Sequence, residues 1–383
     1  MRIGNRGFSL IEILIAIGIL AIIMAMNSQL LQDFIRMQTQ QNVIVSNQFE
    51  TTIGLEMLRN DVSSAGFGLA DSFRSPPGMY TEAADAPALQ FNSAPNPPLP
   101  LNHSNDVSGS AGYAANSDYL VIRSPAVGMS QTAGKWTNIV TTDFHKWNDA
   151  NLDMVDGQDY VIVLKPRTAL GNTPGAMSEL IVSGGTYAII YNSTVAVNAA
   201  FQPDATKEEK FLAFGLGTVA EGVPARPFNR ADYYIRLNSA DPVPNPNCAP
   251  GTGTLVKEVL NQKDGVGIRH SLIQCAASMQ VIFRLDTNAD GVPDQSVNTL
   301  AGLNSMDIKQ QVVEVQIYLL VHDGVIDGRF RWPNQVVTVG PQAGAPGAGL
   351  GADIDLRTLL GNDNWPFYRW KIHTLVIKPK SFY

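Results

Sequence analysis

The chain has 383 residues, of which 45% are hydrophobic and 16% are charged, and its formal net charge at pH 7 is -7. This length and composition are sufficient for a sizeable buried core, so they exclude a disordered chain as the default. The acidic balance and the lack of a cluster of Lys and Arg argue against nucleic-acid binding, because phosphate backbones are bound by clustered cations.

An apolar helix is predicted at the start of the chain. Residues 1–7 form a short leader with two arginines, and an almost unbroken apolar run follows from Phe8 to Met26. At about 1.5 Å per residue, these roughly 19 residues span the hydrocarbon core of a bilayer, about 30 Å thick. The basic leader predicts a single membrane span with a cytoplasmic N-terminus and an exported C-terminal part. No small-residue cleavage site follows Met26, as it would in a secretory signal.

Glu12 is the single carboxylate within this apolar run. An acidic side chain costs on the order of 2.5 to 3.5 kcal/mol at the centre of a bilayer and somewhat less near the interface. A buried charge becomes tolerable when it is paired. We therefore expect Glu12 to require a cationic partner.

The residues Gly7-Phe8-Ser9-Leu10-Ile11-Glu12, followed by an apolar helix, resemble the cleavage motif of type IV prepilins and type II secretion pseudopilins. The resemblance implies that a prepilin peptidase cleaves between Gly7 and Phe8, so that residues 1–7 are a leader peptide, and methylates the new amine of Phe8. It also implies that Glu12 pairs with the Phe8 amine of a neighbouring subunit during assembly. The alternative is a signal anchor with an incidental glutamate.

One long helix is predicted from Phe8 to about Ala65. No proline occurs before Pro76, and Gly18 and Gly54 are the only glycines between these bounds. At about 1.5 Å per residue this helix would extend about 87 Å, which is much longer than a bilayer is thick. Its second half must therefore leave the membrane.

We assign residues 8–26 to a transmembrane or filament-core segment and residues 27–66 to an amphipathic half that packs on a globular domain. The second half carries apolar residues at steps of three or four, which is the spacing of one helix face. The stripe predicted to make this contact comprises Leu31, Phe34, Ile35, Gln38, Val45, Phe49, Ile53, Leu58 and Val62.

Residues 67–383 are predicted to form an extracytoplasmic, β-rich globular domain. Residues 72–117 are rich in Pro, Asn, Ala and Ser and predict a long surface loop with a short helical turn. Strands rich in β-branched and aromatic residues follow, separated by turns instead of long helices, which predicts antiparallel sheets packed on the first helix. The predicted fold class is α+β and pilin-like. The predicted strands cover residues 118–123, 160–164, 187–191, 231–237, 279–284, 312–321 and 374–377.

The two cysteines, Cys248 and Cys275, both lie in the part predicted to be exported. In an oxidising compartment they predict one disulfide, which would stabilise the fold by about 3 kcal/mol on the loop-entropy estimate. Two free thiols are the alternative. A metal site at these cysteines is disfavoured because the chain has neither a C-x-x-C motif nor a nearby pair of histidines.

The segment from Asp286 to Asp294 matches the front of a calcium loop. Alternating oxygen ligands can converge on one hard cation, and Gly291 permits the sharp turn. An EF-hand proper is rejected because Val297 stands where its last glutamate belongs. The alternative is an acidic β-turn without a metal, and no cofactor is required. The candidate calcium ligands are Asp286, Asn288, Asp290, Val292 and Asp294.

An enzyme is not predicted, because no nucleophile, base and metal constellation can be assembled from the motifs. A second resemblance is carried by the Asp-x-Asn-x-Asp-Gly loop, the segment 308–321 and the final segment 368–377, which are similar to PilW-type minor pilins, relatives of the J-type pseudopilins. It implies a minor pilin that works with other pilins or minor pilins, a prepilin peptidase and the pilus assembly machinery, and that passes from the inner membrane to the pilus. The alternatives are a type II secretion pseudopilin and a membrane-anchored extracytoplasmic binding protein or adhesin.

Overall fold

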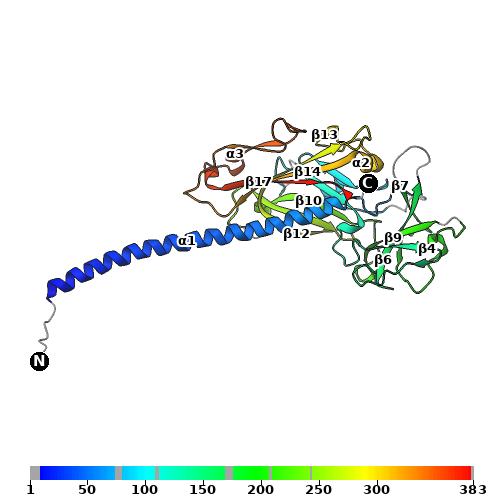
Figure 1. Ribbon diagram of the computed structural model, residues 1–383, viewed down its shortest axis with the longest axis horizontal. Coiled ribbons are helices and arrows are strands. Elements are labelled where there is room, and N and C mark those ends of the chain that lie inside the picture. Colours follow the sequence, from blue (N-terminus) through cyan, green and yellow to red (C-terminus); the bar gives the residue numbers. More distant parts are fainter. Residues whose placement is uncertain are drawn as a thin grey trace, which may run out of the picture.

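The computed structural model describes residues 9–73, 80–107, 112–168, 176–206, 209–241 and 244–380. A long N-terminal helix runs into a body of antiparallel β-sheets, and the two ends of the molecule lie far apart (Figure 1). The predicted α+β, pilin-like architecture is confirmed.

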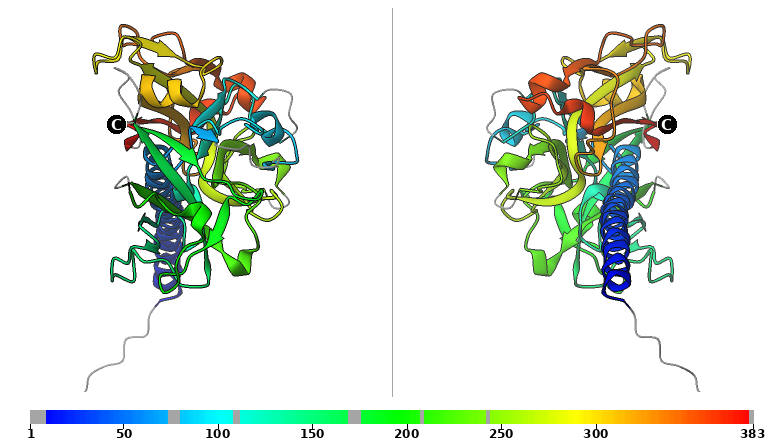
Figure 2. Two further views of the ribbon diagram at one scale, coloured as in Figure 1. Left: turned by 90° about the vertical axis from the view of Figure 1, so that its right-hand side faces the viewer. Right: turned by 90° about the vertical axis from the view of Figure 1, so that its left-hand side faces the viewer.

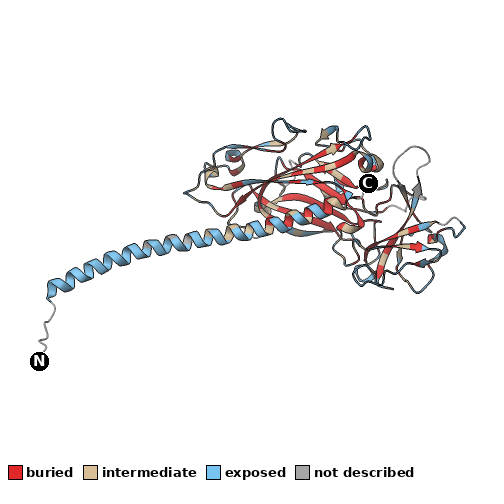
Figure 3. Ribbon diagram, in the orientation of Figure 1, coloured by how far each residue is buried: buried red, intermediate tan, exposed pale blue. Residues whose placement is uncertain are grey.

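Helix α1 covers Leu10–Ser63, 54 residues without interruption, as predicted. It ends where Ser64 donates its backbone N–H to carbonyl groups of the last turn and the chain enters a left-handed conformation at Gly66. Such a glycine is a common way to end a helix, because it has no Cβ to oppose a positive φ. Figure 3 shows that the helix is exposed along most of its length and becomes buried only near its C-terminus.

The body is built on an eight-stranded sheet that contacts the C-terminal part of α1. The strand order is β17-β14-β12-β11-β10-β3-β2, with β13 paired to β12, and all these pairs are antiparallel. Its core contains the buried face of α1 together with apolar side chains of the central strands. The strands are β2 (Leu101–Ser104), β3 (Tyr119–Arg123), β10 (Arg230–Leu237), β11 (Gly253–Leu260), β12 (Gly267–Leu285), β13 (Gln295–Val297), β14 (Val312–Asp323) and β17 (Arg369–Ile377).

A second, seven-stranded sheet forms a lobe at the end of the molecule opposite the N-terminus, which we call the distal lobe (Figures 1 and 2). Its order is β1-β7-β6-β9-β4-β5, with β8 paired to β6, and its pairs are antiparallel except β1 with β7. It has its own apolar core. The strands are β1 (Ser72–Phe73), β4 (Trp136–Val140), β5 (Asp143–Phe144), β6 (Asp159–Thr168), β7 (Ala176–Leu180), β8 (Ala188–Ile190) and β9 (Lys210–Thr218).

Short elements complete the body. Strands β15 and β16 form a two-stranded sheet. Of the two short helices, α2 follows β13 of the large sheet and α3 follows β16. These elements are β15 (Val336–Val339), β16 (Ala352–Asp355), α2 (Ser305–Gln311), α3 (Leu356–Leu360), and the 3-10 turns η1 (Ala88–Phe91), η2 (Pro125–Val127), η3 (Ala199–Phe201), η4 (Val219–Glu221), η5 (Asn238–Ala240) and η6 (Trp365–Phe367).

The described parts of residues 72–117 contain the predicted helical turn, η1, but the rest of them is not the surface loop that was predicted. They include β1, η1 and β2, and the side chain of Glu82 is buried against Arg123 and Arg230, at 2.8 and 3.0 Å. Burial alone would raise the pKa of Glu82, but the two arginines outweigh it and lower that pKa. The prediction failed because the polar composition of the segment suggested exposure. The partners that allow Glu82 to be buried, Arg123 and Arg230, lie far away in the sequence.

Candidate functional site

The first turn of α1 is closed by two reciprocal hydrogen bonds between Ser9 and Glu12. The Ser9 side-chain oxygen accepts a bond from the backbone N–H of Glu12 at 3.3 Å, and Glu12 Oε2 accepts one from the backbone N–H of Ser9 at 2.9 Å. This is a capping box, which satisfies two N–H groups that have no partner inside the helix. The Ser-x-x-Glu spacing of Ser9 and Glu12 is the sequence signature of this cap, although it was not among the predictions.

This cap defines what Glu12 can still do. The carboxylate has two oxygens, which together can accept about four hydrogen bonds, and the bond from Ser9 engages Oε2. Glu12 is exposed at the N-terminal end of the helix, where the positive end of the helix dipole also favours a negative charge. Gly7 and Phe8, the predicted processing residues, lie outside the described residues.

The N-terminal part of α1 is long and apolar enough to cross a membrane, and its most apolar stretch is not buried at all. From Leu10 to Thr39, every residue whose side chain is described is exposed. Exposing large apolar side chains to water is unfavourable. A contiguous exposed apolar surface therefore marks a membrane or interaction site. This segment therefore requires surroundings that the isolated chain does not provide.

Further along α1, an apolar stripe faces away from the sheet. Val45, Phe49 and Ile53 are 64%, 68% and 48% exposed, whereas Leu58 and Val62 are fully buried. The prediction that the whole stripe packs on the globular domain is therefore right for Leu58 and Val62 but wrong for the rest of the stripe. The other exposed members are Leu31, Phe34, Ile35 and Gln38. Residues at steps of four drift around a helix that has 3.6 residues per turn, so the predicted stripe passes from one face to another. We call the exposed part the outer ridge, and it comprises Leu31, Phe34, Ile35, Val45, Phe49 and Ile53.

The opposite face of α1 holds the helix to the large sheet. Gly54 lies so close to β12 that a Cβ at this position would be 2.6 Å from Ile273 Cγ1. About two helical turns beyond Gly54, Asp61 pairs with Lys257 at 2.6 Å and accepts a hydrogen bond from the Tyr233 hydroxyl, also at 2.6 Å. Burial raises the pKa of Asp61, although Lys257 opposes this shift. We call Asp61, Lys257 and Tyr233 the anchor of α1. It could not be predicted from the sequence, because its three residues come from three separate elements.

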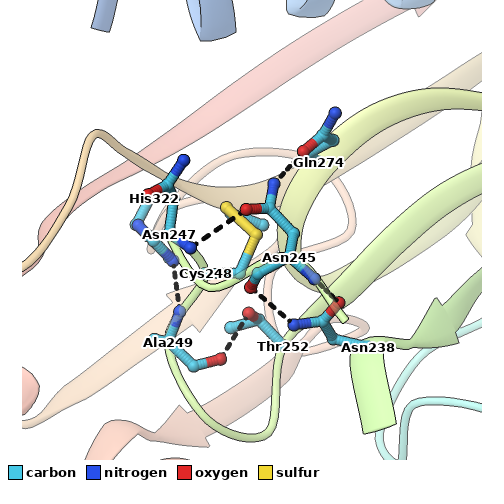
Figure 4. The surroundings of a disulfide bond; sticks show 9 residues. Asn238, Asn245, Asn247, Cys248, Ala249, Thr252, Gln274 and His322 are labelled. Atoms are coloured by element: carbon cyan, nitrogen blue, oxygen red, sulfur yellow. Dashed lines mark hydrogen bonds between the residues drawn. A yellow bond between two sulfur atoms is a disulfide. The ribbon is translucent and has the colours of Figure 1, made fainter. Parts of the chain in front are cut away.

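Cys248 and Cys275 form the predicted disulfide, with a Cα–Cα distance of 4.9 Å (Figure 4). The bond joins β12 to the loop that precedes β11. His322 lies beside it, where its Nε2 accepts the backbone N–H of Ala249 at 2.9 Å. The potential metal-ligand atoms of Cys248, Cys275 and His322 all lie within 4.8 Å of one another, so this group was considered as a metal site. Because the sulfurs are bonded to each other, they offer no thiolate to a metal.

The predicted calcium loop connects β12 to β13 as a hairpin. Its oxygens accept hydrogen bonds from the loop itself: Asp286 from the backbone N–H groups of Asp290 and Gly291, and Asp294 from Thr287. The hydrogen bonds from Thr287 lower the pKa of Asp294. These contacts are those of an acidic turn, the alternative that the sequence left open. Calcium also takes amide and carbonyl oxygens, such as those of Asn288 and Val292, so calcium binding stays a prediction.

Comparison with known proteins identifies one part of the chain. Residues 2–26 match the family model of the prokaryotic N-terminal methylation motif. No curated protein and no solved structure matches the chain. The matched residues contain Gly7, Phe8 and Glu12, and they lead directly into α1. The chain thus combines a methylation motif of the type IV prepilin and pseudopilin class with a pilin-like α+β fold.

Proposed function

We propose that this protein is a minor pilin of the PilW type, a structural subunit that is incorporated into a type IV pilus or primes its assembly. A prepilin peptidase would cleave between Gly7 and Phe8 at the cytoplasmic face of the inner membrane, and the pilus assembly machinery would then extract the subunit. The proposal is carried by one observation: the methylation motif continues into a helix whose apolar surface is left uncovered by its own chain.

In this proposal the apolar segment of α1 exchanges lipid for the helices of neighbouring subunits. Fully burying a Leu, Ile or Phe side chain contributes about 1.5 to 3 kcal/mol relative to leaving it in water. The outer ridge extends this surface well beyond the membrane-length segment, on the face that the sheet leaves free. The body, by contrast, already buries its own core and would lie on the outside of a filament.

Glu12 would select the register between subunits. The methylated amine of Phe8 carries a positive charge, and the carboxylate of Glu12 in a neighbouring subunit would pair with it. The capping bond from Ser9 uses one oxygen of this carboxylate, so pairing does not require the cap to open. A charge left unpaired in an apolar helix bundle would be costly, which makes every other register unfavourable.

Replacement of the acid tests this mechanism. Glu12→Gln keeps the shape and a hydrogen-bond acceptor but removes the charge, and it should enter the membrane normally yet be depleted at least tenfold from sheared filaments. Mass spectrometry of the mature N-terminus should show methylated Phe8 in both proteins. The matched control is Glu56→Gln, at an exposed acid of the same helix. Normal incorporation of Glu12→Gln would overturn the pairing mechanism, and an N-terminus other than methylated Phe8 would overturn the proposed function.

A type II secretion pseudopilin has the same motif and the same mechanism of assembly. Co-purification separates the two roles: a minor pilin should be found in filaments sheared from the cell surface, whereas a pseudopilin should remain with the secretion apparatus in the envelope. Detection in the envelope fraction alone, together with a defect in protein secretion in its absence, would decide for the pseudopilin.

A further inference from the structure

The distal lobe carries a hollow of about 470 Å³ at its surface, between the segment that leads into β4 and the loop that follows β5. This volume is within the range of pockets that hold small ligands. Neither the N-terminal motif nor the contact with α1 involves this region. The hollow is lined by Gln131, Ala133, Gly134, Lys135, Trp136, Trp147, Asn151 and Leu152.

The apolar part of this lining comprises two tryptophans, Trp136 and Trp147, together with Ala133 and Leu152. The ring centroids of the two tryptophans are 5.3 Å apart and the ring planes meet at 69°, so the pair makes a corner. Trp136 is 39% exposed and the neighbouring Leu152 is 52% exposed. A contiguous apolar surface that is open to water and rimmed by polar side chains is typical of a binding site.

The corner is held rigidly although it lies at the surface. The indole N–H of Trp147 donates to the backbone carbonyl of Trp136 at 3.0 Å. The carboxylate of Asp153 accepts the backbone N–H groups of Trp147 and Asp149 at 2.7 and 3.1 Å, and the ammonium group of Lys135 donates to the Asp153 carbonyl at 2.7 Å. A surface that is already ordered loses less conformational entropy when a ligand binds.

The chemistry of the lining selects a class of ligand. Its polar members are two exposed amide side chains, Gln131 and Asn151, and the single cation Lys135; no carboxylate is present among the described lining residues. Amides both donate and accept hydrogen bonds, which suits hydroxyl groups. A pyranose ring has an apolar C–H face that can lie on an indole and a rim of hydroxyls that can meet the amides. A ligand without polar groups, such as a hydrocarbon chain, would leave any amide that it covers without a hydrogen-bond partner, at a cost of about 1 to 3 kcal/mol each.

We propose that the Trp136–Trp147 corner of the distal lobe is a binding site for a neutral saccharide. The pyranose ring lies against the indoles, and Gln131 and Asn151 contact its hydroxyl groups. The site is on the lobe at the far end of the molecule from the N-terminus of α1 (Figure 1). A ligand can therefore reach it while α1 is engaged in a membrane or a filament, and the proposal does not depend on the function proposed above.

The test uses the full chain in a polyoxyethylene detergent, because glycoside detergents would compete for the site. Neutral di- and trisaccharides of glucose, galactose and mannose are titrated by calorimetry and by saturation-transfer NMR. We expect saturable binding of at least one of them. Trp136→Ala should weaken this binding at least tenfold, which is about 1.4 kcal/mol. Val140→Ala is the matched control, because Val140 lies on the same strand, is 42% exposed and does not line the hollow.

A second variant guards against local unfolding. Trp147→Phe keeps an aromatic ring but loses the indole N–H that bonds to Trp136, so it should weaken binding while circular dichroism stays unchanged. Tetramethylammonium chloride and N-acetyl-phenylalaninamide serve as a cationic and an apolar probe. The proposal is overturned if none of the saccharides binds, whether or not one of the two probes does. It is also overturned if Trp136→Ala binds the saccharide as tightly as the unchanged protein does.

Discussion

The two ends of α1 are made of similar residues but meet different surroundings. From Thr51 to Ser63 the helix lies against β12 and contributes fully buried side chains to the core of the large sheet, whereas the described side chains from Leu10 to Thr39 are exposed. The outer ridge runs from one segment to the other on the side of the helix that faces away from the sheet. An apolar helix face must be buried against something. Its periodicity in the sequence does not show whether the burying surface belongs to the same chain or to another molecule.

Removing the anchor of the buried end should have the largest effect on stability. Asp61→Ala leaves the ammonium group of Lys257 buried without its partner and removes the acceptor of the Tyr233 hydroxyl. Loss of one partner of a buried ion pair typically costs about 3 to 5 kcal/mol. Denaturant unfolding followed by tryptophan fluorescence should show this loss. Glu56→Ala, at an exposed ion pair of the same helix, should change stability by less than about 1 kcal/mol. Equal effects of the two variants would contradict the anchor.

Acid should weaken the body and not the exposed part of α1. Burial lowers the pKa of His322 to about 4, against about 6.5 for an unfolded chain. The neutral imidazole is therefore favoured in the fold, and stability is lost as the pH falls from about 6.5 toward 4, by up to about 3 kcal/mol. His322→Gln keeps an acceptor for the Ala249 N–H and should remove this part of the pH dependence. Parallel pH profiles of both proteins would exclude the assignment.

Calcium, if it binds at the hairpin between β12 and β13, should stabilise the body by a smaller amount. A ligand that binds the folded state alone at about ten times its Kd contributes about 1.4 kcal/mol, which raises the Tm of a body of this size by a few degrees. Thermal melts in calcium and in chelator should differ for the unchanged protein and coincide for Asp290→Asn. Coincident melts of the unchanged protein would leave the loop as a metal-free turn.

The outer ridge should give the smallest change in stability and the clearest contrast with the buried end. Phe49→Ala removes a side chain that is 68% exposed, so the free energy of unfolding should change by less than about 0.5 kcal/mol. Leu58→Ala, at a fully buried position of the same helix, should cost about 2 to 5 kcal/mol. Under the proposed function, Phe49→Ala should nevertheless reduce incorporation into filaments. A large loss of stability in Phe49→Ala would show that the ridge has a cover within its own chain.

Local signals in the sequence were sufficient for much of this molecule. Uninterrupted helix formers predicted α1, and β-branched and aromatic runs predicted β3, β10 and β14 within a residue or two. The methylation motif is also local. Strand β9 was missed because Gly215 and Gly217 disfavour a strand, yet Gly215 is required there: a Cβ would lie 2.4 Å from the Thr132 carbonyl oxygen.

The rest depends on residues that meet only in the folded chain. Asp61 and Lys257 come from a helix and a strand that are distant in the sequence. Glu82 and Arg230 are also far apart in the sequence but form an ion pair in the fold. The tryptophan corner requires the turn after β5 to bring Trp147 back to Trp136. No spacing rule marks such pairs, because each member separately resembles an ordinary core or surface residue.

The position of the disulfide has a mechanical consequence. A pull along α1 enters the body at β12, where Gly54 contacts Ile273, two residues before Cys275. Strand β12 is hydrogen-bonded to β11 on one side and to β14 on the other. Drawing it out would shear both ladders at once instead of opening them one bond at a time, and the covalent bond to Cys248 ties it to the neighbouring loop. Force along α1 is thus passed to a strand that is hydrogen-bonded on both sides and tied to a loop by the disulfide.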